Sequence, residues 1–155
     1  MIVTHPFEPV YDENSRILIL GSFPSVRSRS DGFYYGHPQN RFWRLMSALY
    51  GEKSLQSTEE KRNFLLKNGI ALWDVIASCE IENSSDSSIR NAIPNDLERI
   101  LKNAQIHTIY TNGKTADKLY RKYYQKASIC LPSTSPANAV WTFEKLLQSW
   151  GIIRF

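Results

Sequence analysis

The chain has 155 residues, of which 42% are hydrophobic and 22% are charged, and its formal net charge at pH 7 is +4. These values are typical of one soluble globular domain with a single core. The apolar runs are far too short to cross a bilayer, and the N-terminal segment lacks the pattern of a signal peptide. We therefore expect one domain over 1–155, a cytoplasmic location and no membrane partner. The mild basicity is compatible with a nucleic-acid partner but does not establish one.

The cysteine and histidine content argues against a metal centre. The chain has two cysteines, Cys79 and Cys130, which cannot supply the four thiolates of a usual iron–sulfur cluster or of a Cys-only zinc site. The three histidines, His5, His37 and His107, show no metal-ligand spacing. We expect no metal and no cofactor.

The predicted elements alternate between strands and helices. Residues 1–15 form an extended arm, and Ile17–Gly21 is apolar without alternation, as a parallel strand buried on both faces would be. Further strands are predicted at 70–75, 106–110 and 127–131, with an edge strand at 152–155. Helices are predicted at 41–50, 58–67, 94–103 and 138–150, and a turn at 111–114 leads into another helix that ends near 125. Polar loops are predicted over 22–36 and 80–88.

This alternation predicts an α/β fold with a mostly parallel sheet, right-handed crossovers and helices on both faces. Ligands of such sheets bind at the carboxyl ends of the strands. Four polar segments directly follow predicted strands and should therefore gather into one site: Gly21–Ser25, Asp74–Ser78, Asn112–Lys114 and Ser133–Asn138.

Several residues of this region each allow two interpretations. Gly21–Ser25 lacks both the dinucleotide fingerprint and the P-loop pattern, so a tight turn and a binding loop are equally open. Tyr34 and Tyr35, in a loop, either stack on a planar ligand or pack the loop onto the body. Asn40 is a helix N-cap or a catalytic amide, and its chemistry alone favours the cap. His37 is a base or, as we favour, a structural histidine that donates to the backbone.

Ser133–Pro136 precedes a predicted helix and offers hydroxyls and backbone N–H groups. This combination suits an anion, although an ordinary capping turn has the same composition. Five cations are candidates to add positive charge around it: Arg27, Arg29, Arg41, Lys114 and Lys118.

The residues in these segments resemble a known family. Gly-Ser-Phe-Pro-Ser at 21–25 and Tyr-Tyr-Gly-His-Pro-Gln-Asn-Arg-Phe-Trp at 34–43 resemble the uracil-DNA glycosylase superfamily. The block 37–43 is similar to that of the mismatch-specific uracil/thymine glycosylases. The wider combination is more similar to the hypoxanthine-DNA glycosylase branch, called family six; it adds 71–75, Ser78-Cys79, 86–89 and Ser133–Pro136.

The resemblance implies an α/β/α sandwich with a four-stranded, mostly parallel sheet. It also implies a monofunctional DNA glycosylase, without a cofactor, that flips a deaminated base out of DNA and hydrolyses its N-glycosidic bond. Hypoxanthine is the expected base, DNA containing it the expected partner, and a monomer the expected state. In a bacterium the enzyme would associate with the nucleoid.

The first motif departs from the superfamily pattern. Other branches place a catalytic Asp or Asn there, whereas this chain has Phe23 before Pro24 and neither a carboxylate nor an amide. In the hypoxanthine branch a downstream asparagine is implicated, and Asn40 is the matching position. The resemblance therefore makes Asn40 the catalytic candidate.

The remaining site residues follow from the same matches. The base pocket is expected to comprise Gly21, Ser22, Phe23, Tyr35 and Asp74. Contacts to the DNA backbone and the insertion loop are expected from Ser25, Lys114, Ser133, Thr134, Ser135, Pro136 and Asn138. Asp74 reads equally well as a base-edge acceptor or as a structural salt-bridge partner. Two alternatives stay open: a uracil/thymine mismatch glycosylase, and a non-catalytic module that binds lesion DNA.

Overall fold

The structure is a computed structural model and describes all residues, 1–155. Its strands are β1 (Ile2–Thr4), β2 (Ile17–Gly21), β3 (Ile70–Asp74), β4 (Ile76–Glu80), β5 (Arg90–Pro94), β6 (Thr108–Asn112) and β7 (Ile129–Leu131). Its helices are α1 (Val26–Asp31), α2 (Phe42–Tyr50), α3 (Thr58–Lys67), α4 (Glu98–Leu101), α5 (Lys114–Tyr123) and α6 (Phe143–Trp150), with short 3₁₀ turns η1 (Asp86–Ser88) and η2 (Gly151–Ile153). None of these helices combines the length and the apolar content that a membrane span requires.

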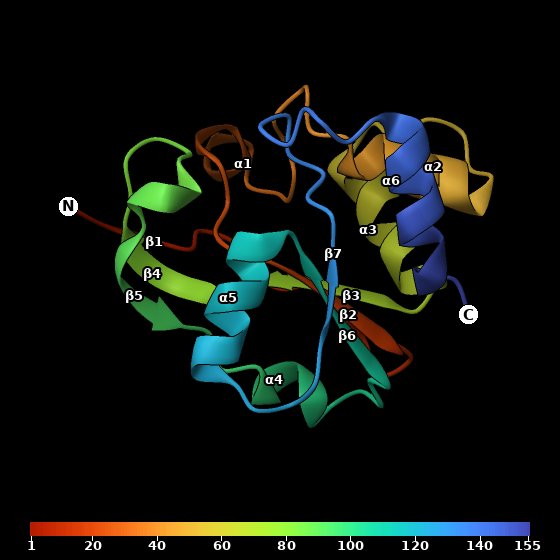
Figure 1. Cartoon of the computed structure of the whole chain (residues 1–155). Helices are drawn as coiled ribbons and strands as arrows, with labels where there is room; N and C mark the ends of the chain where they lie inside the picture. Colours follow the sequence, from red (N-terminus) through yellow and green to blue (C-terminus); the bar gives the residue numbers. More distant parts are fainter.

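The central sheet has four parallel strands in the order β3-β2-β6-β7 (Figure 1). Every residue of β2 and β3 is buried, which explains why their sequences lack an alternating pattern. The connections from β2 to β3 and from β6 to β7 run in opposite directions across the sheet. Right-handed connections of this kind put their helices on opposite faces, and they leave a crevice at the carboxyl ends of β2 and β6.

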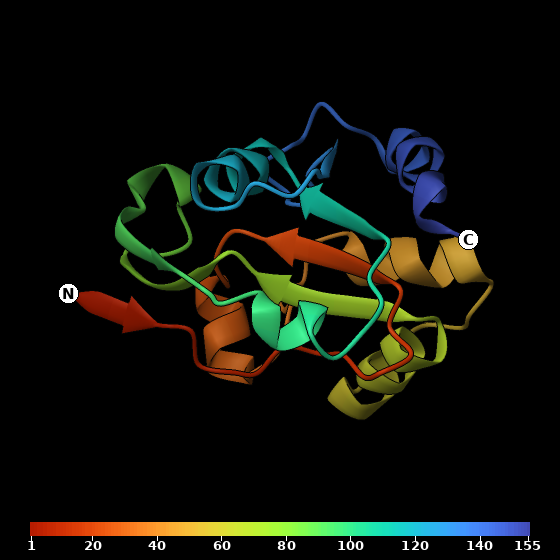
Figure 2. The ribbon, with the colours of Figure 1, turned by 90° about the horizontal axis from the view of Figure 1, so that it is seen from below.

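Helices surround this sheet, with α3 beside β3 at one edge and α5 beside β6 and β7 at the other (Figure 2). Helix α2 packs against α6, and their fully buried side chains include Phe42, Leu45, Met46 and Trp150. The spacing of the apolar residues in α2 is what buries one side of it. Gly51 ends α2 in the left-handed conformation, at φ 66°. The predicted α/β class with a four-stranded parallel sheet is confirmed.

A second sheet is absent from the sequence-based prediction. It is antiparallel, with the order β1-β4-β5, and it lies beside the amino-terminal arm (Figure 1). The arm thus contributes a strand instead of running free. We did not foresee β4 because Ile76–Glu80 directly follows β3, separated from it only by Val75. Two short strands with mixed burial leave little periodicity to detect.

Five other predicted elements differ from the structure. The polar segment after Ser25 forms α1, because the Ser25 side chain accepts the Ser28 N–H and Gly32 ends the helix at φ 76°. The predicted helix 138–150 begins only at Phe143, capped by Thr142, and the preceding segment is a loop. The predicted helix 94–103 shortens to α4, and 152–155 forms no strand. The third strand of the central sheet lies two residues later than predicted.

Candidate active site

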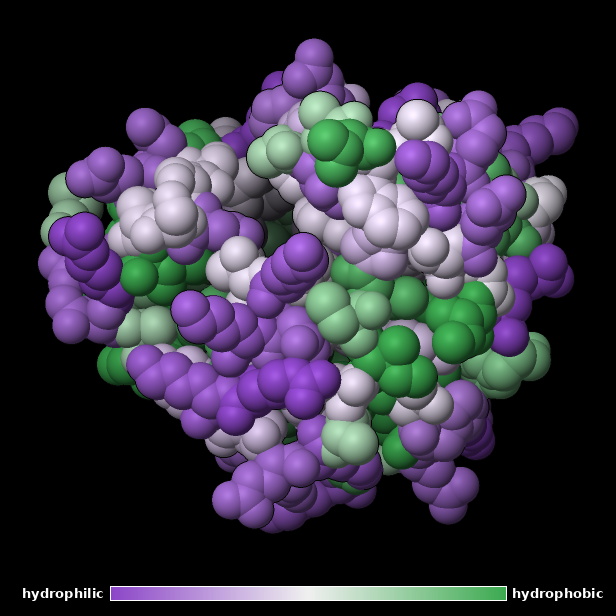
Figure 3. Space-filling model, in the orientation of Figure 1, coloured by the Kyte–Doolittle hydropathy of each residue, from purple (hydrophilic) through white to green (hydrophobic).

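A cavity of about 280 Å³ opens at the carboxyl ends of the central strands. Figure 3 shows the surface hollowed at this place, above α5. The volume lies near the lower limit of small-molecule sites, which suits one planar ring system. Most of the predicted site residues line it: Gly21, Ser22, Phe23, Ser25, Tyr35, Asn40, Asp74, Ser133, Thr134, Ser135 and Pro136.

Two predicted residues do not line this cavity. Asn138 lies behind the wall, where its side chain donates to the Ser133 carbonyl at 3.0 Å and so helps to shape the loop. Lys114 is the exposed first residue of α5. Any contact that Lys114 makes with DNA would therefore lie outside the cavity.

Gly21 allows the Asp74 carboxylate to lie directly against the end of β2. A Cβ atom at Gly21 would fall 2.4 Å from Asp74 Oδ1, closer than any real side chain could lie. The two residues are paired in register across β2 and β3. The glycine is thus required by close approach and not by backbone conformation, and it leaves a carboxylate oxygen in the cavity wall.

The other oxygen of Asp74 is held by the amino-terminal arm. Asp74 Oδ2 lies 2.8 Å from His5 Nε2, and both side chains are only 4% exposed. His5 Nδ1 lies 2.8 Å from the Phe7 carbonyl, which can only accept, so Nδ1 carries a hydrogen. The Nε2–Oδ2 contact then requires a second hydrogen, so the buried pair holds one shared proton.

Asn40 is oriented by a chain of hydrogen bonds that fixes which end of its amide meets the cavity. The Thr134 N–H donates to Asn112 Oδ1 at 3.0 Å, so Asn112 Nδ2 donates to Thr134 Oγ1, also at 3.0 Å. The Thr134 hydroxyl must then donate, and it does so to Asn40 Oδ1 at 2.9 Å. The Phe42 N–H donates to the same oxygen at 2.9 Å. Asn40 therefore uses Oδ1 at the start of α2 and presents Nδ2 as a hydrogen-bond donor.

Tyr35 combines backbone strain with an unpartnered hydroxyl. Its φ is +53°, unusual for a residue with a side chain, and its ring stacks on Phe42 with centroids 4.2 Å apart. The hydroxyl is buried without a hydrogen-bond partner. Burial raises the pKa of Tyr35 well above its usual value, the charge of Asp74 raises it further, and the nearby Asn112 amide lowers it. The hydroxyl thus stays protonated, and strained, unsatisfied groups of this kind mark functional sites.

Hydrogen bonds from the Arg41 side chain stabilise the Ser133–Trp141 loop. The guanidinium donates to the carbonyls of Thr134, Ser135, Asn138 and Trp141. The hydrogen-bonding capacity of Arg41 is therefore largely used by the loop, and its charge lies beside Ser133–Pro136 without a free side for direct contact with a phosphate. The Ser133 and Ser135 hydroxyls accept backbone N–H groups within the loop, which leaves their own hydrogens free to donate.

Sequence reasoning gave no individual role to three polar residues of this site. Asn112 was expected there only as part of the strand-end segment Asn112–Lys114. Asp86 lines the cavity, and its segment 86–89 entered the prediction only through the family resemblance. Loss of hydration raises the pKa of its carboxyl, the Ser22 hydroxyl lowers it, and the charge of Asp74 raises it. His5 comes to the site only through tertiary folding, and the sequence around it does not indicate a contact with Asp74.

His37 lines the cavity, and its hydrogen bonding differs from our prediction. Its Nδ1 accepts the backbone N–H of Gln39 at 3.1 Å instead of donating to the backbone. In the neutral ring the hydrogen is then on Nε2.

The comparison with known families agrees with this geometry. A family model described as the uracil DNA glycosylase superfamily matches residues 8–151. The chain belongs to the uracil DNA glycosylase superfamily. The sequence-based prediction of a DNA glycosylase, a hydrolase of N-glycosidic bonds, is thereby confirmed.

Individual members of the uracil DNA glycosylase superfamily resemble the chain over most of its length. A protein from Methanosarcina acetivorans named hypoxanthine DNA glycosylase is 38% identical over 142 residues, covering 88% of this chain and 89% of the relative. A protein of the same name from Methanosarcina barkeri is 41% identical over 139 residues, covering 85% and 86%. A solution NMR structure from Methanosarcina acetivorans, described as a candidate uracil DNA glycosylase, has a TM-score of 0.78 and 36% identity. That likeness covers 99% of this chain and 96% of the other.

Proposed function

We propose that the chain is a single-domain, monofunctional DNA glycosylase that removes a deaminated base, hypoxanthine first. One observation carries the choice of a base with a ring N–H beside a carbonyl: a carboxylate and an amide donor face the same cavity. Hypoxanthine is placed before uracil because both relatives described above are named hypoxanthine DNA glycosylase. Hypoxanthine offers N1–H as a donor, with O6 and N7 as acceptors. Asp74 is the acceptor for N1–H, and Asn40 Nδ2 is a donor for the acceptor atoms. Adenine has a lone pair at N1 and an amino group at C6, so it reverses this pattern and is rejected.

The other groups supply binding. Tyr35 has one ring face against Phe42, which leaves its second face for the flipped base. The free hydroxyls of Ser133 and Ser135 are donors for the flanking phosphates. Flipping costs a few kcal/mol and is cheapest for a mispaired base, which suits inosine opposite a non-cognate partner.

The amide of Asn40 acts in the transition state. As the bond between C1′ and the base breaks, the base gains negative charge and the sugar gains positive charge. A donor already oriented toward the base stabilises that negative charge without reorganising. Asn40 in this role does not activate water, because both of its Oδ1 contacts are occupied by donors.

A second candidate substrate is uracil, which carries an imide N–H between two carbonyls and so fits the same donor and acceptor groups. A duplex with a single inosine or a single uracil, treated with alkali after a single-turnover reaction, separates the two. We expect alkali-labile breakage at inosine and no breakage before alkali. Breakage at uracil alone would overturn the hypoxanthine assignment, and lesion binding without base release would support the non-catalytic alternative.

We also propose that the enzyme acts as a monomer in the cytoplasm, where its DNA substrate lies. The three residues that the proposed mechanism uses on the base, Tyr35, Asn40 and Asp74, are all supplied by this one chain. Light scattering at working concentration tests this, with the mass of a 17.9 kDa chain as the expected result.

A further inference from the structure

The segment after β2 lacks an acid, but the fold brings one to it from elsewhere in the chain. Asp86 lies in η1, more than sixty residues beyond Ser22, yet the two line the same cavity. Two contacts hold this loop over the start of α1. The Val26 N–H donates to Ser84 Oγ at 2.9 Å, and Arg29 donates to the Asn83 carbonyl at 2.5 Å. The position of Asp86 therefore follows from ordered loop contacts.

The two carboxylates of the cavity lie at different depths. Asp74 is 3% exposed, at the end of a buried strand, and is bonded to His5. Asp86 lies in an exposed turn at the edge of the cavity, with the Ser22 hydroxyl beside its carboxylate. A flipped nucleotide enters base first, so its sugar stays near the mouth. The buried Asp74 is therefore expected to face the base, and Asp86, at the edge of the cavity, is expected to face the sugar.

We propose that Asp86 is a catalytic residue of this glycosylase, acting as the general base for water and as the anion facing the sugar cation. The inference rests on the proposed function. The C1′–N9 bond breaks and its electron pair leaves with the base. The water oxygen then bonds to C1′ while one water proton passes to Asp86. The base takes a proton from solvent, and the products are an abasic site and free hypoxanthine.

The surroundings of Asp86 suit this role. The other titratable groups in the cavity are Asp74, Tyr34, Tyr35 and His37, and Arg29 lies beside the loop that carries Asp86. Loss of hydration raises the pKa of the Asp86 carboxyl, with Ser22 lowering it and Asp74 raising it. A carboxylate whose pKa is raised above its usual value takes a proton from water more readily than an ordinary carboxylate does.

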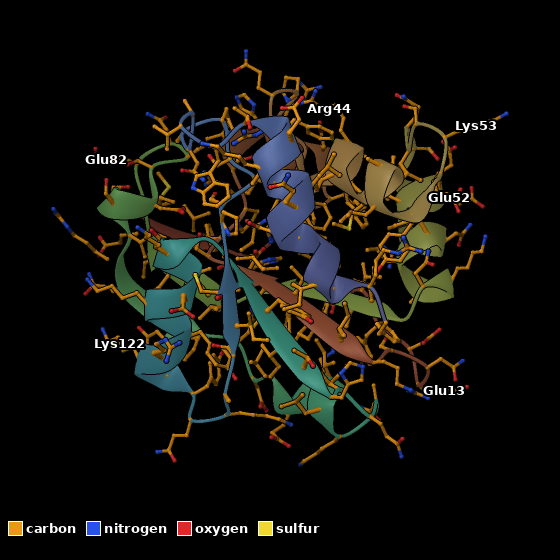
Figure 4. The ribbon with its side chains drawn as sticks, turned by 45° about the vertical axis from the view of Figure 1, so that its right-hand side comes forward. Glu13, Arg44, Glu52, Lys53, Glu82 and Lys122 are labelled. Carbon is orange, nitrogen blue, oxygen red and sulfur yellow. The ribbon has the colours of Figure 1, made fainter.

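The test is the variant Asp86→Asn, assayed under single turnover on inosine duplex. We expect base release to slow by roughly 10²-fold or more, as for loss of a general base, while lesion binding is retained or tightened. Glu82→Gln is the matched control, because Glu82 belongs to the same loop, lies outside the cavity and points away from the body of the protein (Figure 4). The control is expected to react at the wild-type rate.

The pH dependence of the base-release rate distinguishes a catalytic role of Asp86 from a purely structural one. In the wild type, base release falls as pH drops through the pKa of Asp86, because only the ionised form accepts a proton. Asp86→Asn is expected to lose that limb of the profile. A variant that stays within about threefold of the wild-type rate, or reacts faster, overturns the inference. If the wild type itself releases no hypoxanthine, the proposed function fails instead, so the two failures are distinguishable.

Discussion

At the scale of single residues, the site depends on the orientation of one amide. The side-chain amide of Asn40 has one orientation, because the Thr134 hydroxyl and the Phe42 N–H both donate to its oxygen. The Thr134–Asn112 pair and the Phe42 N–H leave only Nδ2 facing the cavity. The N-cap of α2 is Arg41 and not Asn40, although the Asn40 oxygen still accepts the N–H of Phe42, the first residue of the helix. The Asn40 nitrogen is left for the cavity.

Replacing Asn40 with Ala is therefore expected to affect catalysis and stability separately. Loss of the donor should slow base release by about 10²–10³-fold, as for other oriented transition-state donors. Loss of the Oδ1 contact should lower the free energy of unfolding by about 1 kcal/mol. Single-turnover kinetics and urea denaturation measure the two effects. Gln39→Ala, an exposed neighbour, is the control, and full activity of Asn40→Ala would remove the residue from the mechanism.

The His5–Asp74 pair makes a different prediction. Removing one partner leaves a buried polar group unpaired, so His5→Ala should lower the free energy of unfolding by about 3–5 kcal/mol. Removing both with His5→Ala/Asp74→Ala should cost less than the sum of the two single changes. Urea denaturation of the four proteins in this cycle measures the coupling. Additive effects would show that the contact contributes nothing of its own.

At the scale of elements, the decisive segment is the Ser133–Trp141 loop. Sequence reasoning expected a helix from 138, whereas the structure shows a loop whose carbonyls converge on Arg41. A helix would satisfy those carbonyls internally. The side chain of Arg41 takes over that task, and the loop keeps a shape that can reach DNA.

Arg41→Lys is expected to loosen this loop without disturbing the cavity floor. A lysine has one point charge and cannot contact four carbonyls in the plane of a guanidinium. If the loop assists flipping, base release from duplex should fall by about tenfold while release from single-stranded inosine DNA is retained. Arg44→Lys is the control, because Arg44 lies over the Phe143 ring at 5.3 Å and points outward (Figure 4). Equal losses on both substrates would contradict a role in flipping.

The elements also show where sequence information sufficed. The ends of β2 and β3 were predicted to within one residue, because strands that are buried along their whole length have an uninterrupted apolar sequence. α1 was missed because its six residues are mostly polar, and the helix depends on its Ser25 and Gly32 caps. The second sheet was missed because its pairing joins the arm to a segment over seventy residues away. Apolar patterns indicate burial, but they reveal neither a short polar helix defined by its caps nor a pairing between segments far apart in the chain.

The same distinction applies to the site. Strand-end reasoning together with the family resemblance found most of the cavity wall. It could not reveal that Arg41 is engaged by backbone carbonyls, or that His5 completes Asp74, because both contacts join segments far apart in sequence. The direction of the Asn40 amide was equally inaccessible, since it depends on hydrogen bonds that only the folded structure contains.

At the scale of the whole molecule, the net charge of +4 predicts a salt-dependent affinity for DNA. Binding should weaken as salt rises, because each neutralised phosphate releases counterions. If Lys114 contacts a phosphate, Lys114→Ala should reduce the slope of log affinity against log salt by about one. Lys122→Ala is the control, since it lies on the same helix toward the end away from the cavity and points to solvent (Figure 4). An unchanged slope for Lys114→Ala would exclude that contact.

The contacts that form the cavity also determine at what stage of folding the protein can first bind a lesion. Asp74 is bonded to a residue 69 positions earlier, and Asn40 to one 94 positions later. Such long-range contacts form late, because distant segments must meet before they contribute stability. A nascent chain therefore has no binding site until Thr134 has left the ribosome. Partly folded molecules would neither bind lesions nor occupy DNA unproductively, so the activity should appear in one step with global folding.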